Sequence, residues 1–169
     1  MPKPRAFLRV PQPSDEAELL AATRASRTLH RRWVSPPATQ AAVRAYLARP
    51  QDPSTAAFFV CRKDTHQIVG VASITGIIQG VFRSGYLGYH AFSGHERQGL
   101  MREGIARLLR HAFKVLKLHR LEANIQPGNQ ASIALAKACG FQLEGYSPRC
   151  LKIGGRWRDH ERWAILAKP

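Results

Sequence analysis

The sequence predicts a mixed α/β fold, built as a single domain from residues 1–169. The chain has the length of one ordinary domain, and 44% of its residues are hydrophobic, which is enough for a sizeable core. Runs with the alternation of strands are interspersed with runs that have the three- and four-residue spacing of helices. No repeat, low-complexity segment or internal linker divides them. We therefore expect one sheet with helices packed against it, in the order β-α-α-β-β-β-α-β-α-β-β.

The first elements are a strand and two helices. The strand, over 7–10, ends at the prolines that follow it. Ser14 precedes two acidic residues, which predicts an N-cap and a helix that runs to about residue 32. Thr39 predicts the cap of a second helix, over 39–48, which ends before the next proline.

Three strands follow, over 56–62, 68–78 and 84–92. The polar segment 63–67 predicts the turn between the first two, and Gly80 predicts the turn into the third. These strands are expected to form the centre of the sheet.

The second half of the chain alternates helix and strand. A helix over 99–117 carries an apolar stripe made of Met101, Ile105, Leu108, Leu109, Ala112 and Leu116. A strand over 120–126 precedes a helix that begins at Asn129 and ends at Gly140, a typical C′ glycine. Two last strands meet at the Gly-Gly pair 154–155, which is a strong hairpin signal.

The composition argues for the cytoplasm and against a metal site. No apolar run approaches the ~20 residues that a membrane span needs, and the first residues lead into no apolar segment of a secretory signal. Cys61, Cys139 and Cys150 are odd in number and widely spaced, which favours a reducing compartment over disulfides or zinc. The histidines show no ligand spacing, so we expect no metal.

The formal net charge of +15 is large for this length. It is spread over the chain, with +7 in residues 1–85 and +8 in residues 86–169. Such a surface attracts polyanions, including RNA and acidic cofactors. An ordinary solubilising surface explains the same charge, and both interpretations stay open.

The run 96–101 has the features of an anion site. It lies between the strand 84–92 and the helix 99–117, where the first-turn N–H groups of a helix are unpaired and its dipole favours negative charge. A bound phosphate is the preferred interpretation, and an ordinary helix start is the alternative.

Three motifs, in order, resemble the GCN5-related N-acetyltransferases (GNAT). Gly88-Tyr89 stands before the Gln-Gly-Leu-Met run 98–101, and Pro-Gly-Asn-Gln-Ala-Ser at 127–132 precedes Gly-Phe-Gln-Leu-Glu-Gly-Tyr at 140–146. Gly-Arg-Trp-Arg-Asp-His at 155–160 follows. The likeness covers nearly the whole chain, and it is strongest to the bacterial branch that acetylates the N-terminal alanine of a ribosomal protein.

The resemblance implies a mostly antiparallel sheet in which the strands 84–92 and 120–126 splay apart to admit acetyl-CoA. The loop would hold the coenzyme's pyrophosphate, although Glu96 and Met101 depart from the family's usual pattern and Glu96 is expected to point outward. The implied cofactor contacts in this region are Tyr89, His90, Ala91, Arg97, Gln98, Gly99, Leu100, Met101 and Arg102. A main-chain N–H near Tyr89 would polarise the acetyl carbonyl, and a half-buried strand aromatic is the other interpretation of Tyr89.

Asn129 and Ser132 complete the implied site. Asn129 would bond the pantetheine amide, although its role as a helix N-cap already explains it. Ser132 would stabilise the departing thiolate, because the tyrosine that many relatives use is Ala136 here. A solvated helix serine is the alternative.

The general base is open between Glu122, His90 and a water relay. Asn124 occupies the position where some relatives have a glutamate, and Glu122 faces the same side of that strand. His90 is the second candidate because histidine titrates near neutrality, but a structural role is open for both residues.

A site without a strong base favours an α-amine. Reaching the neutral amine at pH 7.4 costs about 1 kcal/mol for an α-amine and about 4 for lysine. We expect acetylation of a protein N-terminus, with a polyamine, an antibiotic or another small amine as the alternative. A non-catalytic RNA- or nucleotide-binding module is the rival. Ribosome or RNA association through the basic surface is a further hypothesis. An acidic partner is another, for the cluster at Arg24, Arg27, His30, Arg31 and Arg32, where solvated charge is the alternative.

Overall fold

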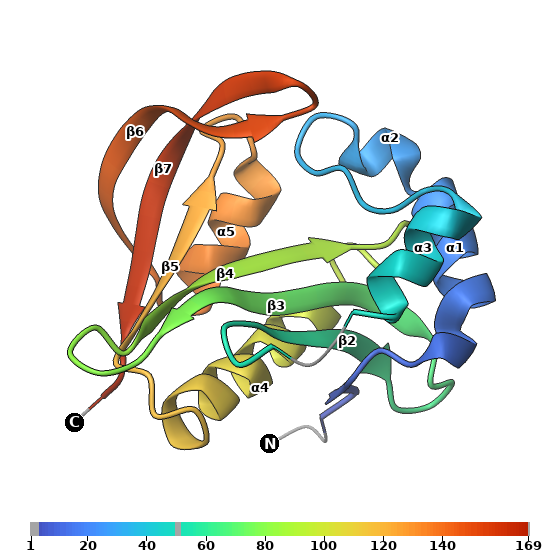
Figure 1. The fold of residues 1–169 in the computed structure, drawn as a ribbon, viewed down its shortest axis with the longest axis horizontal. Coiled ribbons are helices and arrows are strands. Elements are labelled where there is room, and N and C mark those ends of the chain that lie inside the picture. Colours follow the sequence, from blue (N-terminus) through green and yellow to red (C-terminus); the bar gives the residue numbers. More distant parts are fainter. Residues whose placement is uncertain (1–3, 50–51, 169) are drawn as a thin grey trace.

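The computed structural model describes residues 4–49 and 52–168, and the mixed α/β fold is confirmed (Figure 1). Seven strands form one sheet in the order β1-β2-β3-β4-β5-β7-β6. All neighbouring pairs are antiparallel except β4 and β5, which are parallel. The strands are β1 (Ala6–Arg9), β2 (Ala56–Arg62), β3 (Ile68–Ile78), β4 (Ser84–Ala91), β5 (Arg120–Ile125), β6 (Gln142–Ile153) and β7 (Arg156–Leu166).

Helices in the described ranges cover both faces of this sheet. They are α1 (Glu16–Ala25), α2 (Arg27–His30), α3 (Gln40–Leu47), α4 (Leu100–Lys114) and α5 (Gln130–Ala138). The first three gather near the far end of β4, while α4 runs along the opposite side of the central strands (Figure 1). None of these helices has the length and apolar character needed to cross a membrane.

Alternation along β2 divides the core into two layers. Val60 faces the apolar stripe of α4, in the larger cluster of buried side chains. Phe59, the preceding residue, faces the other way and packs with Leu19 of α1 and Val43 of α3. The central strands are therefore covered on both faces. A ligand can reach them only where two neighbouring strands separate.

The helix expected over 14–32 is broken, and that prediction was wrong. A 3₁₀ turn, η1 (Pro13–Asp15), precedes α1, and the carboxylate of Asp15, not Ser14, accepts the Gln12 N–H at 2.7 Å. The chain breaks again at Ser26, whose hydroxyl donates to the carbonyl of Ala22 and accepts the Ser93 N–H. A serine hydroxyl that bonds a carbonyl four residues back competes with the helix ladder, and here it also anchors the end of β4.

The other helix and turn signals are confirmed. The Thr39 hydroxyl accepts the Ala42 N–H at 3.2 Å and begins α3. Gly140 adopts a φ of +94° directly after α5, as a C′ glycine should. Gly154 and Gly155 both have positive φ in the β6–β7 turn, which is the conformation of a type I′ hairpin.

Candidate active site

The sheet opens between its two parallel strands. β4 and β5 pair only over three positions, from Ser84 opposite Arg120 to Tyr86 opposite Glu122. Beyond that point the strands diverge, β4 toward α2 and β5 toward the β6–β7 hairpin (Figure 1). The expected splay is present, and residues 87–91 of β4 border the gap.

The main-chain groups of β4 face this gap in alternation. Phe92 donates its N–H to Val69 of β3, so Ala91 and Tyr89 direct their N–H and C=O groups to the opposite side, away from β3. The Ala91 carbonyl is bonded by the Nε2 of His30, at 2.6 Å. The two N–H groups have no strand beside them, since β5 has moved away, and they are free to bind a guest chain in the manner of a missing strand.

The loop between β4 and α4 presents a run of free amides. Among the described residues, nothing accepts a hydrogen bond from the main-chain N–H groups of residues 97–102. Positive φ angles at Arg97 (+59°) and Gly99 (+78°) turn the loop sharply into the helix. A helix start with unpaired donors and the positive end of the dipole is suited to an anion.

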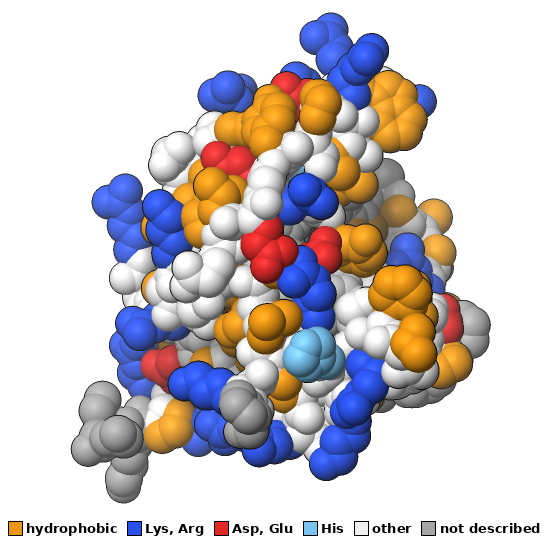
Figure 2. Space-filling view, turned by 90° about the vertical axis from the view of Figure 1, so that its left-hand side faces the viewer, with side chains coloured by type: hydrophobic (Ala, Val, Ile, Leu, Met, Phe, Trp, Pro, Cys, Tyr) orange, Lys and Arg blue, Asp and Glu red, His pale blue; other side chains and the backbone are white. Residues whose placement is uncertain are grey.

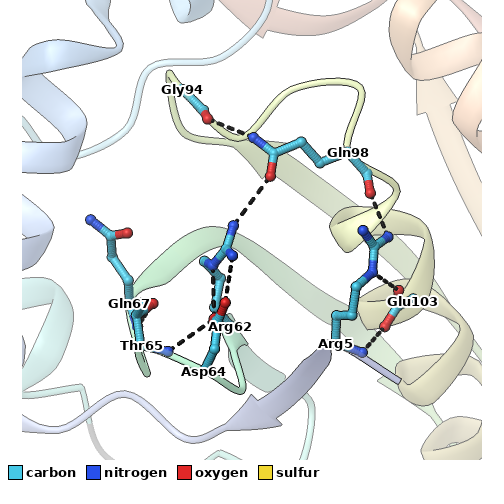
Figure 3. Close-up of polar contacts among 8 residues, drawn as sticks. All are labelled: Arg5, Arg62, Asp64, Thr65, Gln67, Gly94, Gln98 and Glu103. Atoms are coloured by element: carbon cyan, nitrogen blue, oxygen red, sulfur yellow. Dashed lines mark hydrogen bonds and ion pairs between the residues drawn. The ribbon is translucent and has the colours of Figure 1, made fainter. Parts of the chain in front are cut away.

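The side chains of Arg5 and Arg62 form hydrogen bonds to Gln98 of this loop (Figure 3). Gln98 donates its side-chain amide to the Gly94 carbonyl at 2.8 Å and accepts from Arg62 at 3.2 Å. Arg5 donates to the main-chain oxygen of Gln98 at 2.6 Å and pairs with Glu103. The exposed Gln98 side chain is therefore turned toward Gly94 and Arg62, and its main-chain N–H remains for a ligand.

The side chains on the open side of the loop are basic. Arg97 and Arg102 are exposed, and within the described part of the chain neither forms an ion pair. Glu96 turns its carboxylate back onto the Gly94 N–H at 2.7 Å. The local charge near the free amides thus favours an anion.

Asn129, Ser132 and Tyr89 meet on the other side of the gap. The Asn129 side chain accepts the Ser132 N–H at 3.2 Å, as an N-cap does. The Tyr89 hydroxyl donates to the main-chain oxygen of Ser132 at 2.8 Å. Burial raises the pKa of Tyr89, so its hydroxyl remains a donor. The Ser132 hydroxyl has no partner in the part of the chain that the structure describes, and it is free to donate.

The two expected base candidates lie apart from Ser132. Glu122 stands where β4 and β5 still pair, and Arg120 donates to its carboxylate at 2.8 Å. Since each strand residue advances the chain by ~3.3 Å, its partner Tyr86 lies about 10 Å along β4 from Tyr89. Glu122 is therefore engaged in an ion pair outside the gap.

His90 lies on the opposite face of β4 from Tyr89. Burial, and then the neighbouring His30 ring, lower the pKa of His90 to about 3. Its Nε2 is buried and has no hydrogen-bond partner among residues 4–49 and 52–168, and the two rings lie edge to face at 5.0 Å. This imidazole is neutral at physiological pH but is a weak proton acceptor.

His90 lines a pocket that the sequence did not reveal. The pocket has a volume of about 250 Å³ and lies against the Gly88–His90 stretch of β4. Its walls come from α1, α3, β3 and the segment after α2, through Leu19, Val34, Pro36, Pro37, Tyr46, Val71 and Ser73. The titratable residues in this lining are His90, Tyr46 and Tyr89, and the lining contains no Asp, Glu, Lys or Arg. Such a wall arises only when four distant segments pack together, and no local pattern signals it.

No group of three or more His, Cys, Asp or Glu side chains that could hold a metal occurs in residues 4–49 and 52–168.

Comparison with known sequences identifies the family of this chain. Residues 5–142 match the sequence model of the acetyltransferase (GNAT) domain family. The chain is 36% identical over 100 residues to the probable N-acetyltransferase YjcK of Bacillus subtilis (strain 168), covering 59% of this chain and 55% of that protein. It is 37% identical over 102 residues to the ribosomal protein uS5-alanine N-acetyltransferase of Escherichia coli (strain K12), covering 60% and 53%. The chain thus spans about half the length of these curated relatives.

Solved structures agree over a greater length. The ribosomal-protein-S5-alanine acetyltransferase of Vibrio fischeri superposes with a TM-score of 0.86 at 25% identity, over 100% of this chain and 98% of that one. Mycobacterium smegmatis RimJ, solved in complex with CoA-disulfide, gives a TM-score of 0.89 at 26% identity, over 96% and 82%.

Proposed function

The chain belongs to the acetyltransferase (GNAT) family, and we propose that it transfers acetyl from acetyl-CoA to the α-amine of a protein or peptide N-terminus. One observation carries this proposal. Free main-chain donors lie on one side of the opened sheet, an uncharged pocket lies on the other, and the two meet at Gly88–His90 of β4. A thioester and an amine that approach from opposite faces would meet at that point.

The residues present fit the coenzyme. The amides of residues 97–102 would hold its diphosphate, assisted by the charges of Arg97 and Arg102. The open N–H groups of Tyr89 and Ala91 would bond the pantetheine arm as a strand does. Acetyl-CoA, when bound, supplies the acetyl thioester.

Two groups of this chain, and the positioning of the two reactants, would lower the barrier. A free main-chain N–H of β4 would stabilise negative charge on the acetyl oxygen. The Ser132 hydroxyl would donate to the leaving sulfur. The positioning of both reactants on one rigid strand would supply the largest remaining part of the rate enhancement. Because His90 is a weak acceptor and Glu122 is bound to Arg120, the amine proton would leave through water.

A weak base favours an α-amine, which loses its proton at pH ~8, over a lysine at ~10.4. The relatives support the same class, because the Escherichia coli and Vibrio fischeri proteins are named as alanine N-acetyltransferases of a ribosomal protein.

A polyamine is the second candidate, because a spermidine N(1)-acetyltransferase of Vibrio cholerae is 33% identical over 72 residues. The charges of this chain argue against it. Each of its eleven carboxylates accepts a hydrogen bond from the chain itself. Six of them also form ion pairs within the described residues, none of the eleven lines the pocket, and a net charge of +15 would repel a second ammonium.

The test is a CoA-release assay over peptides with free N-termini, a lysine peptide with a blocked N-terminus, and spermidine. Peptide α-amines should be the preferred acceptors. Ser132→Ala should lower kcat about tenfold or more, with CoA affinity changed little. Ser14→Ala, an exposed serine on η1, is the matched control and should behave as the parent. Saturable CoA binding without transfer to any amine would overturn the proposal and leave the non-catalytic module.

A further inference from the structure

The distal half of the β6–β7 hairpin extends beyond the sheet. The pairing of β7 with β5 stops at Glu161 opposite Ile125, whereas its pairing with β6 continues to Arg156 opposite Ile153. Residues 147–159, which we name the arm, therefore have no third strand beside them. In Figure 1 the arm curls over the open end of the sheet.

The arm is basic, and its charges are free. Arg149, Lys152, Arg156 and Arg158 are exposed, and none of them forms an ion pair with a residue that the structure describes. Asp159, its acidic residue, is occupied by the Tyr146 hydroxyl and the Arg149 N–H. Figure 2, which looks onto the side of β6 and β7, shows Lys and Arg spread widely over this face, with several acidic side chains among them.

Strand alternation assigns Arg156 and Arg158 to one face of the arm. Trp163 of β7 and Ile125 of β5 belong to the core beneath α4 and α5. The even-numbered residues of β7 therefore face the other way, on the side of Gln126. Trp157 falls on the face opposite to these two arginines.

A second pair of arginines borders the same face. Gln126 donates its side-chain amide to the Arg32 carbonyl at 3.2 Å, which brings the segment after α2 to the end of β5. Arg31 and Arg32 of this segment are exposed, and a few residues further on it supplies Val34 and two prolines to the pocket wall. This segment is therefore one wall of the pocket, and in the view of Figure 1 the turn of the arm lies near the same segment.

We infer that the acceptor is a polypeptide that carries acidic residues shortly after its N-terminus, bound by Arg31, Arg32, Arg156 and Arg158. This inference rests on the proposed function and adds the substrate class. The first side chain of the acceptor lies in the uncharged pocket, and the carboxylates that follow meet arginines from two sides. Complementary charge of this kind raises association rates and discriminates against like-charged chains.

The arm suits an acidic peptide better than RNA. Single-stranded RNA is bound by an aromatic platform together with basic side chains. Here Trp157 lies on the face opposite to the two arginines, where Lys152 is its partner across the strand pair, so the arginines and the aromatic ring do not form one platform. The residues that share the arginines' face are aliphatic, Leu151 opposite Arg158 and Ile153 opposite Arg156, which suits contact with a peptide.

The experiment uses three peptides with the same uncharged first residue and with glutamates, serines or lysines at the third to fifth positions. With the full chain at low salt, kcat/KM should be at least about tenfold higher for the acidic peptide than for the lysine peptide, and the difference should shrink with salt. The double variant Arg156→Glu with Arg158→Glu should remove or reverse this preference. Arg110→Glu with Lys114→Glu, on exposed positions of α4, changes the net charge by the same amount. This control variant should keep the preference for the acidic peptide.

Thermal unfolding and CoA titration of both variants establish that each is folded. Equal turnover of the three peptides, or an equal loss of preference in the α4 variant, would overturn the inference while leaving the acetyltransferase proposal intact. The inference would also be overturned if the Arg156→Glu, Arg158→Glu variant lost binding of a short RNA but kept the parent's peptide preference. Absence of CoA release with every peptide would instead defeat the proposed function.

Discussion

The Tyr89 hydroxyl and the main-chain oxygen of Ser132 are joined by a hydrogen bond of 2.8 Å across the gap between β4 and α5. On β4, Tyr89 is next to the N–H groups that the sheet leaves open. On α5, Ser132 is already fixed by the Asn129 cap. The bond therefore sets the width of the gap at the position proposed for the thioester.

Tyr89→Phe should lower kcat/KM about five- to tenfold, because a hydrogen bond of this kind contributes about 1 kcal/mol. The ring still packs against the core, so the thermal unfolding temperature should fall by only about 2–4 °C, as the loss of one such bond predicts. Tyr86→Phe is the control, since Tyr86 lies on the same strand and half of its surface is exposed. Parent-like kinetics for Tyr89→Phe would show that the gap is held open by other contacts.

Gly99→Ala should weaken CoA binding, because it disturbs the turn that aims the free amides. Alanine at a φ of +78° costs about 1 kcal/mol, and the new Cβ would lie 3.3 Å from the Arg5 guanidinium that holds the loop. Gly80→Ala is matched for backbone strain, with a φ of +73° and open space around it. Both variants should lose similar stability, and calorimetry with CoA should separate them. Equal CoA affinity in the two would remove the loop from the binding site.

Gln98→Ala tests whether the loop must be held rigid. Its side chain points away from the proposed phosphates, yet it links the loop to Arg62 and to Gly94 (Figure 3). We expect KM for acetyl-CoA to rise about three- to tenfold from the loss of two hydrogen bonds, with kcat retained. Gln67→Ala removes an exposed amide from the same neighbourhood and should leave KM unchanged. A fall in kcat alone would contradict this role.

The features that the sequence predicted are those with a local cause. The apolar stripe of α4, the Thr39 and Asn129 caps and the glycines at 154–155 each act within a few residues, so a pattern reveals them. The splay of β4 and β5 came from family resemblance, because no local pattern shows where two distant strands stop pairing.

The features that the sequence missed depend on distant partners. Ser26 ends α1 because its hydroxyl also binds the Ser93 N–H, 67 residues away. Asp15 precedes α1, but its carboxylate, which Arg9 holds at 2.7 Å, accepts the Gln12 N–H of the preceding turn and does not cap the helix. The pocket beside His90 combines four segments, and the pKa of His90 is lowered by burial and by the ring of His30. These features depend on contacts between residues that are distant in the sequence, so local sequence patterns do not predict them.

Burial of neutral His90 should make the fold sensitive to acid. Its pKa is about 3 in the folded protein and ~6.5 in an unfolded chain. Below pH 6.5 the unfolded chain therefore binds a proton that the folded protein refuses, and the free energy of unfolding should fall by about 1.4 kcal/mol per pH unit until the pH approaches 3. The carboxylate of Asp15, whose pKa Arg9 lowers against the opposing effect of burial, adds acid sensitivity only near and below pH 4. Denaturant unfolding between pH 7 and pH 5 reports mainly on the histidines, because burial also lowers the pKa of His95, and the His90 variant separates the contribution of His90. His90→Gln should flatten the curve in that window, whereas His119→Gln, on an exposed residue, should keep the parent slope. Parallel curves for the parent and His90→Gln would mean that His90 takes up its proton without unfolding the chain.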